Sequence, residues 1–168
     1  MSSTQTDRTP QPARSSELPA IPTIAEVQDN PDALRAFNTR VVDEFRHNGG
    51  TVSGPFRGLN VLLLTMIGAK SGRTRITPLE YFESNGRLLL FGTFGGAPTN
   101  PAWVHNLRAN AHAHVEVGHD AYDVTAHELP ESEGAAVFAD IASGHPHLAG
   151  YPTPPRTIPV FELVKSPR

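Results

Sequence analysis

Residues 61–91 read VLLLTMIGAKSGRTRITPLEYFESNGRLLLF and contain the signals that decide the fold. Val61–Ile67 is an unbroken apolar run, which predicts a strand buried on both faces. Arg75–Phe82 alternates well enough to form a second strand, antiparallel to the first. Asn85-Gly86 is the strongest short hairpin signal, and it leads into a third strand at Leu88–Phe91. This stretch therefore predicts an antiparallel sheet built from hairpins.

Upstream of this sheet, the sequence predicts a polar arm and then one helix. Residues 1–28 are rich in Ser, Thr, Gln and Pro, and we expect a flexible N-terminal arm there. Asn30-Pro31 is typical of a helix start, and apolar residues then recur every three or four positions as far as Phe45. The charged face of this helix favours packing on the core over the alternatives, a movable flap or a contact with a membrane surface.

Downstream of the sheet signals, further strands alternate with short helices. Asn100-Pro101 and Pro130 are typical of helix starts. Strands are expected at residues 113–117, 122–129 and 157–164. Pro159 places the last of them at a sheet edge or a bulge. Residues 29–168 thus predict a single domain, mainly β with helices: a barrel-like sheet of about five to six antiparallel strands with about three helices.

The composition argues against several classes of function. The formal net charge is −3, with 14 basic and 17 acidic residues, so general binding to nucleic acid is not expected. The absence of cysteine excludes a disulfide framework, a thiolate metal site and a cysteine nucleophile. No apolar run approaches the roughly 20 residues of a membrane-spanning helix. We expect a cytoplasmic protein, with weak peripheral contact to a membrane left open.

Three places in the middle of the chain offer backbone amides or cations to an anion. Lys70, Arg73 and Arg75 project from one tight turn, whose hydroxyls and amides complete a candidate phosphate or carboxylate site. Gly95-Gly96 lets the main chain approach a ligand closely, and a helix beginning near Pro101 points free N–H groups outward. These places suit an elongated, multiply charged ligand; a merely solvated basic turn is the alternative. Gly-x-Gly-x-x-Gly is absent, which argues against a Rossmann nicotinamide site.

The tryptophan and four of the histidines are further candidate ligand-binding residues. Trp103, the only tryptophan, is more typical of a core than of a platform for a flat heterocycle. His112 and His114 share one strand face, and His119 and His127 follow. Without a cysteine or a helical carboxylate–histidine pattern, solvated strand histidines are favoured and no metal is expected.

Several linked motifs resemble the deazaflavin-dependent nitroreductase family in their order and spacing. They are Leu64–Gly72, Arg75–Leu79, Gly95-Gly96, Asn100–Leu107, Val115–Val117, Thr125-Ala126 and Arg156–Pro159. The resemblance covers about Val61 to Val164. It implies a split β-barrel of the FMN-binding-like type that binds coenzyme F420, an 8-hydroxy-5-deazaflavin with a phosphate and an oligoglutamate tail. It also implies hydride transfer from the reduced cofactor to an electrophilic small molecule: a quinone, an enone or a nitroaromatic compound.

By position, the resemblance implies contacts with the cofactor in several segments. The expected tail and phosphate contacts are Ala69, Lys70, Ser71, Arg75, Ile76, Thr77, Pro78, Leu79 and Glu80. The expected contacts around the deazaflavin are Phe91, Gly92, Thr93, Phe94, Gly95, Gly96, Ala102, Trp103, Val104, His105 and Asn106. Thr93 and Tyr151 are the candidate catalytic residues. The late loop with His145, His147 and Tyr151 is expected to face the substrate.

The chain departs from the family pattern at two positions and leaves alternatives open. Family members often carry a basic residue where Ala69 stands and a lysine where Phe94 stands, so Arg73 is the candidate to supply the missing phosphate contact. The tyrosine-rich substrate loop of nitro-drug-activating members is not reproduced. An FMN-binding oxidoreductase and a non-catalytic carrier or sensor of F420 or lipid are the alternative functions. The oligomeric state, monomer or dimer, is left open.

Overall fold

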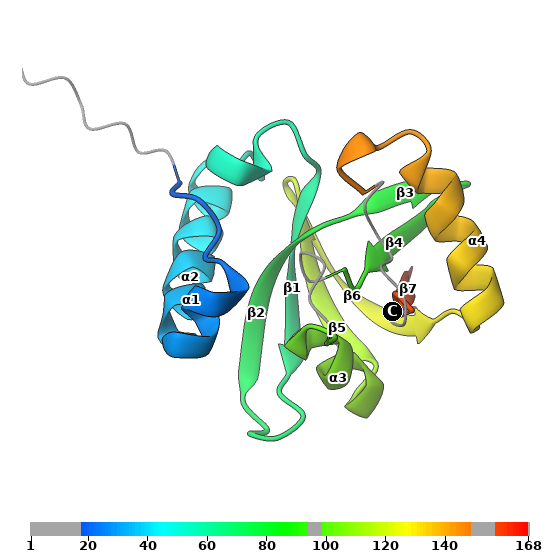
Figure 1. Cartoon of the computed structure of the whole chain (residues 1–168). Helices are drawn as coiled ribbons and strands as arrows, with labels where there is room; N and C mark the ends of the chain where they lie inside the picture. Colours follow the sequence, from blue (N-terminus) through cyan, green and yellow to red (C-terminus); the bar gives the residue numbers. More distant parts are fainter. Residues whose placement is uncertain (1–17, 94–98, 149–156, 168) are drawn as a thin grey trace, which may run out of the picture.

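The computed structural model describes residues 18–93, 99–148 and 157–167 (Figure 1). In this part of the chain, seven strands form one sheet in the order β2-β1-β5-β6-β7-β4-β3, and every neighbouring pair is antiparallel. The strands are β1 (Val61–Ile67), β2 (Thr74–Glu80), β3 (Phe82–Ser84), β4 (Arg87–Phe91), β5 (His112–Val117), β6 (Asp120–Glu128) and β7 (Val160–Lys165).

The two edge strands of the sheet are almost continuous in the chain. β2 ends at Glu80 and β3 begins at Phe82, so Tyr81 alone separates them. The Tyr81 N–H donates to the carbonyl of Asn60 at 2.9 Å, which holds the bend in place. One bent strand therefore joins both edges, and the sheet curls into a barrel (Figure 1). The predicted split β-barrel is confirmed, and counting β2 and β3 together gives the upper number of strands expected.

Four α-helices lie in the described part of the chain: α1 (Ile24–Asp29), α2 (Pro31–His47), α3 (Ala102–Ala109) and α4 (Glu131–Ala142). Short 3-10 helices occur at η1 (Gly54–Phe56) and η3 (Pro146–Leu148). The additional helix, α1, falls inside the segment expected to be an arm. A capping box between Thr23 and Glu26 starts it, and Leu18 is already buried. Helical structure thus begins at Ile24, before residue 29.

Strand β1 separates two hydrophobic cores. Leu62, Leu64 and Met66 face the barrel interior, where they pack with residues of α3, β5, β6 and β7. Val61 and Leu63 face the other side and pack beneath α2. Since both faces are buried, the run is apolar at consecutive positions, as the sequence predicted.

A third core lies between the sheet and α4. Its buried members are Phe82, Leu89, Phe91, Phe138, Ile141, Leu148, Ile158 and Val160. Helices α2 and α4 therefore flank the barrel on opposite sides (Figure 1).

Most segments with a local sequence signal adopt the structure that the signal predicts. Asn30 caps α2 by accepting the N–H of Asp32 at 3.2 Å. Asn85 and Gly86 both have positive φ, 52° and 75°, as a tight hairpin with Asn-Gly requires. At α3, however, Pro101 and not Asn100 occupies the cap position.

The prediction that the last strand lies at an edge or contains a bulge was wrong. β7 pairs with both β6 and β4 and is central in the sheet. Pro159 stands just before the strand, so it removes no donor from the ladder. Its carbonyl accepts the N–H of Gly92 at 2.9 Å, which extends the pairing beyond β4.

Candidate functional site

The β1–β2 turn, residues 68–73, is closed by its own hydrogen bonds. The N–H of Gly68 donates to the carbonyl of Arg73 at 2.8 Å, and the N–H of Gly72 donates to that of Gly68 at 2.9 Å. The hydroxyl of Ser71 accepts the N–H of Arg73 at 3.2 Å. Gly72 has φ +67°, a left-handed conformation that favours glycine. The turn is therefore a defined structure and not an open loop.

Helix α3 holds this turn from outside. The N–H of Ala69 donates to Oδ1 of Asn106 at 2.8 Å, across 37 positions of sequence. Two segments that the sequence singled out separately are thus in direct contact.

Two amides of the turn remain free for a ligand. Within the described residues, the N–H groups of Gly68, Ala69, Gly72 and Arg73 have acceptors, whereas those of Lys70 and Ser71 have none. Both residues are exposed. Adjacent free amides in a turn form a concavity that suits an anion.

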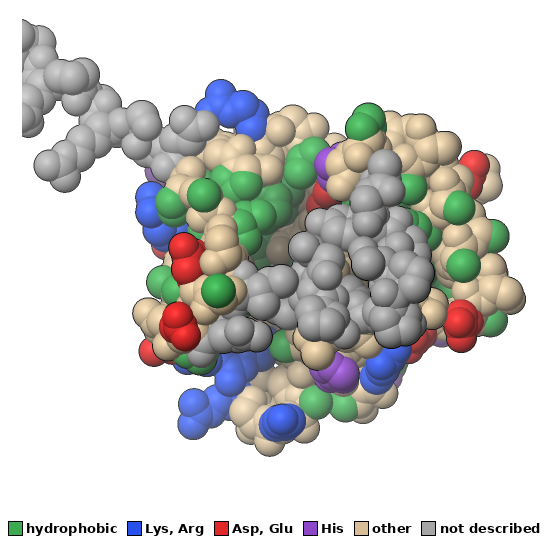
Figure 2. Space-filling view, viewed as in Figure 1, with side chains coloured by type: hydrophobic (Ala, Val, Ile, Leu, Met, Phe, Trp, Pro, Cys, Tyr) green, Lys and Arg blue, Asp and Glu red, His purple; other side chains and the backbone are tan. Residues whose placement is uncertain are grey.

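The cations of the turn, and Arg75 just after it in β2, have no carboxylate partners among the described residues. Lys70 and Arg73 are exposed and Arg75 is half-buried, and none forms an ion pair with a carboxylate in the described ranges. Figure 2 shows Lys and Arg side chains along the lower edge of the molecule, where Figure 1 places the turn and α3. Free backbone amides and positive side chains are therefore available together to bind an anion.

Strand β2 divides the residues expected to bind the cofactor between two faces. Arg75, Thr77 and Leu79 pair with Met66, Leu64 and Leu62, whose side chains face the barrel interior. Ile76, Pro78 and Glu80 pair with Thr65, Leu63 and Val61 and face the α2 side. A strand alternates its side chains, so these six residues cannot all line one surface.

Only part of α3 presents its side chains outward. Trp103 and Val104 are buried, and the Trp103 ring lies edge-on to Phe161 at 5.5 Å between centroids, inside the barrel core. The core interpretation of the tryptophan is confirmed. Ala102 and His105 are exposed and Asn106 is half-buried. Of the α3 residues expected to contact the cofactor, Ala102 and His105 therefore have exposed side chains, whereas Oδ1 of Asn106 already accepts the N–H of Ala69.

Gly92, just after β4, allows α3 to approach the sheet. A Cβ at this position would lie 3.0 Å from Cγ2 of Val104 and 3.2 Å from Pro159. Phe91 is buried against α4 and stacks with Phe82 at 4.9 Å between ring centroids, so its side chain belongs to the third core. Thr93 follows and is half-buried. Phe94, Gly95 and Gly96 lie outside the described residues.

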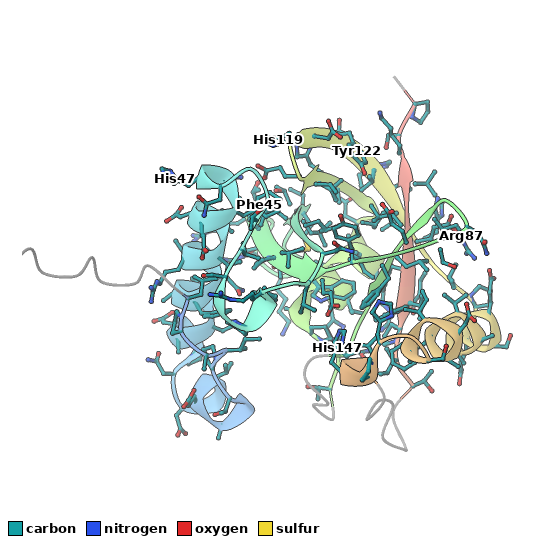
Figure 3. All side chains as sticks on the ribbon, turned by 90° about the horizontal axis from the view of Figure 1, so that it is seen from above. Phe45, His47, Arg87, His119, Tyr122 and His147 are labelled. Atoms are coloured by element: carbon teal, nitrogen blue, oxygen red, sulfur yellow. The ribbon has the colours of Figure 1, made fainter. Side chains whose placement is uncertain are left out.

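The two histidines expected in a substrate loop are held in place by the protein. His145 Nδ1 lies 2.8 Å from the carbonyl of Ile141 at the end of α4. His147 Nε2 lies 2.8 and 3.0 Å from the carboxylate oxygens of Glu80. His147 is the middle residue of η3, and Figure 3 shows it on the side of the barrel between α2 and α4. Tyr151 lies outside the described residues.

The pairings Ala69–Asn106 and Glu80–His147 were not foreseen from sequence. Each joins residues from separate elements, 37 and 67 positions apart. No local pattern marks either pair.

The histidines of β5 and β6 do not assemble a metal site. Among the described residues, no three His, Cys, Asp or Glu side chains gather as ligands. His114 Nδ1 instead lies 2.9 Å from Oδ1 of Asp123 on the neighbouring strand. Of the helices described, none has the length and hydropathy needed to span a membrane.

Arg108, near the end of α3, contrasts with the cations of the turn. Its guanidinium donates two hydrogen bonds to Glu128 at 2.7 and 2.8 Å. These bonds lower the pKa of the Glu128 carboxyl from its ordinary value and raise the pKa of the guanidinium. Arg108 at the end of α3 is thus neutralised by Glu128, whereas the cations of the turn beside α3 have no such carboxylate among the described residues.

Comparison with known proteins identifies relatives with one common description. The family model of F420H(2)-dependent quinone reductases matches residues 38–165. An F420H(2)-dependent quinone reductase of Mycobacterium tuberculosis is 40% identical over 65 residues, which cover 39% of this chain and 44% of that protein. The chain therefore spans less than half the length of the curated relatives it matches.

Two solved structures are also similar to the chain. A structure described as F420-H2 dependent reductase FDR-A is 32% identical, with a TM-score of 0.51, over 62% of this chain and 93% of the other. A second structure, described as a domain-swapped dimer, is also 32% identical, with a TM-score of 0.56, over 79% of this chain and 98% of the other.

Proposed function

The chain belongs to the F420H(2)-dependent quinone reductase family, and we propose that it is an oxidoreductase that uses reduced F420 to reduce a small electrophilic acceptor. The proposed acceptors are quinones, enones and nitroaromatic compounds. Bound in its reduced form, the deazaflavin supplies a hydride to the acceptor, which takes up a proton to complete its two-electron reduction.

The observation that carries this proposal is the set of cations and free amides at the β1–β2 turn. Lys70, Arg73 and Arg75 have no carboxylate partner among the described residues, and the amides of Lys70 and Ser71 have no acceptor there. A phosphate and an oligoglutamate tail match this arrangement in sign and in capacity to accept hydrogen bonds. The residues present therefore fit the anionic part of F420.

The deazaflavin ring would lie against the exposed side of α3 and the segment after β4. Ala102 and His105 offer exposed side chains there, and the half-buried Thr93 follows Gly92. We assign to the Thr93 hydroxyl the role of donating a hydrogen bond to negative charge that develops on the acceptor. The barrel contributes by orienting two flat molecules face to face and by excluding water from between them.

Titration of the purified chain with F420 and, separately, with FMN tests the proposal. We expect saturable binding of F420 and much weaker binding of FMN, whose single phosphate lacks the oligoglutamate tail. Preferential binding of FMN would replace the proposal with an FMN-dependent function.

A panel of quinones, enones and nitroaromatic compounds then tests the reaction. The loss of reduced F420 is followed by absorbance, with acceptor and enzyme each omitted in turn. Binding of F420 without oxidation by any acceptor class would favour a carrier or sensor.

The partner is proposed to be this small-molecule acceptor. Weak contact with a membrane surface, a cytoplasmic location and the Tyr151 role stay predictions. The domain-swapped relative makes the oligomeric state worth measuring by light scattering.

A further inference from the structure

We propose that Asn106 is a positioning residue: its side-chain carbonyl locks the β1–β2 turn so that the amides of Lys70 and Ser71 face an anion. The proposal rests on the function proposed above, and it deepens the account of that site. Asn106 acts here on the protein's own backbone, through the 2.8 Å hydrogen bond from Ala69 N–H to Oδ1.

Helix α3 is a rigid support for this contact. Trp103, Val104 and Leu107, from the same two turns of helix, are all buried in the barrel core. The backbone carbonyl of Asn106 accepts the N–H of Asn110 at 2.9 Å. A side chain that starts from so fixed a backbone places its acceptor with little freedom.

The positive charge of the turn makes an uncharged acceptor the suitable one for this contact. Lys70, Arg73 and Arg75 lie within six positions and have no carboxylate among the described residues. A carboxylate could hold the turn only by neutralising these charges. An amide oxygen is an uncharged acceptor, so Asn106 fixes the turn and leaves its charge for a ligand.

The contact also decides which amides can bind. Ala69 N–H is occupied by Asn106, so the backbone donors left in the turn are those of Lys70 and Ser71. Ala69, expected from the resemblance to touch the cofactor, instead holds the turn in shape. Residues 70 and 71 then bear the backbone part of the anion contact.

The test compares Asn106→Ala with Asn110→Ala. The control is matched, because Asn110 Oδ1 also accepts a backbone N–H, that of His112 at 3.1 Å, at the other end of α3. In Asn106→Ala we expect faster hydrogen exchange of the Ala69 amide by NMR and about five- to tenfold weaker binding of F420, the size of one hydrogen bond. Asn110→Ala should change neither.

Two further measurements separate positioning from a general loss of stability. Binding of the deazaflavin chromophore without its phosphate and glutamate tail should be unchanged in Asn106→Ala, because the turn contacts only the tail. Asn106→Asp keeps the acceptor, so Ala69 should stay protected from exchange. Its added negative charge should weaken F420 binding and flatten the salt dependence of affinity. If Asn106→Ala fails to fold, Asn106→Asp still tests the proposal.

Several results would overturn the inference. They are unchanged Ala69 exchange in Asn106→Ala, equal losses of F420 affinity in both alanine variants, and wild-type affinity with wild-type salt dependence in Asn106→Asp. If the wild-type chain binds no F420, the proposed function fails. The exchange of the Ala69 amide would still decide whether Asn106 fixes the turn.

Discussion

Two groups of cations among the described residues have opposite surroundings. Around the barrel wall, Arg46, Arg87 and Arg108 each donate to carboxylates on another element, at 2.7 to 3.2 Å. In the β1–β2 turn and at the start of β2, Lys70, Arg73 and Arg75 lie within six positions and pair with no described carboxylate. Figure 3 shows Arg87 on the far side of the molecule from α2, so the paired cations are spread around the barrel.

The difference separates charges that serve the fold from charges kept for a ligand. Arg46 joins α2 to Glu116 on β5, and Arg87 joins β4 to Glu162 on β7 and Glu133 on α4. Each of these pairs links elements distant in sequence. The turn is instead held by backbone bonds and by Asn106, and its positive charge is left available. Substitutions in the two regions should therefore affect different measurements.

The largest expected effect follows from removing two cations of the turn together. Lys70→Ala with Arg75→Ala should weaken F420 binding by a few kcal/mol, since each lost charged contact is worth about 1.5–3 kcal/mol. The midpoint of thermal unfolding should hardly change, because neither side chain has a described carboxylate partner. Titration of F420 at several salt concentrations measures the loss, and unchanged affinity would refute the assignment of the turn.

A substitution beneath α3 should lower both the stability of the fold and the affinity for F420. Gly92→Ala places a Cβ 3.0 Å from Val104 Cγ2, and α3 carries both Asn106 and Arg108. We expect a loss of about 1–3 kcal/mol in the free energy of unfolding, as for an overpacked core. F420 binding should weaken as well. Denaturant unfolding measures the loss of stability. Wild-type stability in the variant would mean that α3 can shift to accommodate the added methyl group, and would contradict the prediction.

A substitution in the wall should have the opposite pattern to one in the turn. Arg46→Ala removes a bidentate pair with Glu116, and Arg46 is about half exposed, so the stability loss should be about 1 kcal/mol or less. F420 affinity should match that of wild type, which makes this variant the arginine control for the turn substitutions. A clear loss of F420 affinity would remove the distinction between the two regions.

The smallest expected effect is an acid dependence at the Arg108–Glu128 pair. Hydrogen bonding by Arg108 lowers the pKa of the Glu128 carboxyl below its ordinary value of 4.5. A carboxyl with a lowered pKa in the folded state stabilises the protein above its unfolded-state pKa, and this contribution is lost as pH falls through the lowered value. Arg108→Gln should remove that contribution, so the two proteins should differ slightly at pH 7 and converge as the pH falls through the lowered pKa of Glu128. A difference that grows on acidification would contradict the sign.

Local signals predicted the elements of this fold well. Asn30 and Asn85-Gly86 start a helix and a hairpin as their backbone chemistry requires, and Val61–Ile67 is buried on both faces. The signals failed where a distant partner decides. Pro159 suggested an edge, yet β7 lies at the centre of the sheet because its neighbours come from residues far along the chain.

The candidate site divides in the same way. The sequence placed cations in one tight turn next to glycine and serine. Tight turns favour glycine and serine, and long charged side chains project from them into solvent. The sequence did not show which of residues 75–80 share a face, or that Glu80 is held by His147.

The sequence by itself determined the strands, the hairpins and the charge of the turn, since each depends on neighbours within a few residues. Only the tertiary structure decided that β2 and β3 close the barrel and that Asn106 holds the turn through Ala69. It also decided which cations are neutralised. Hydrogen bonds and ion pairs between distant residues depend on how the sheet curls, and no local pattern in the chain records that geometry.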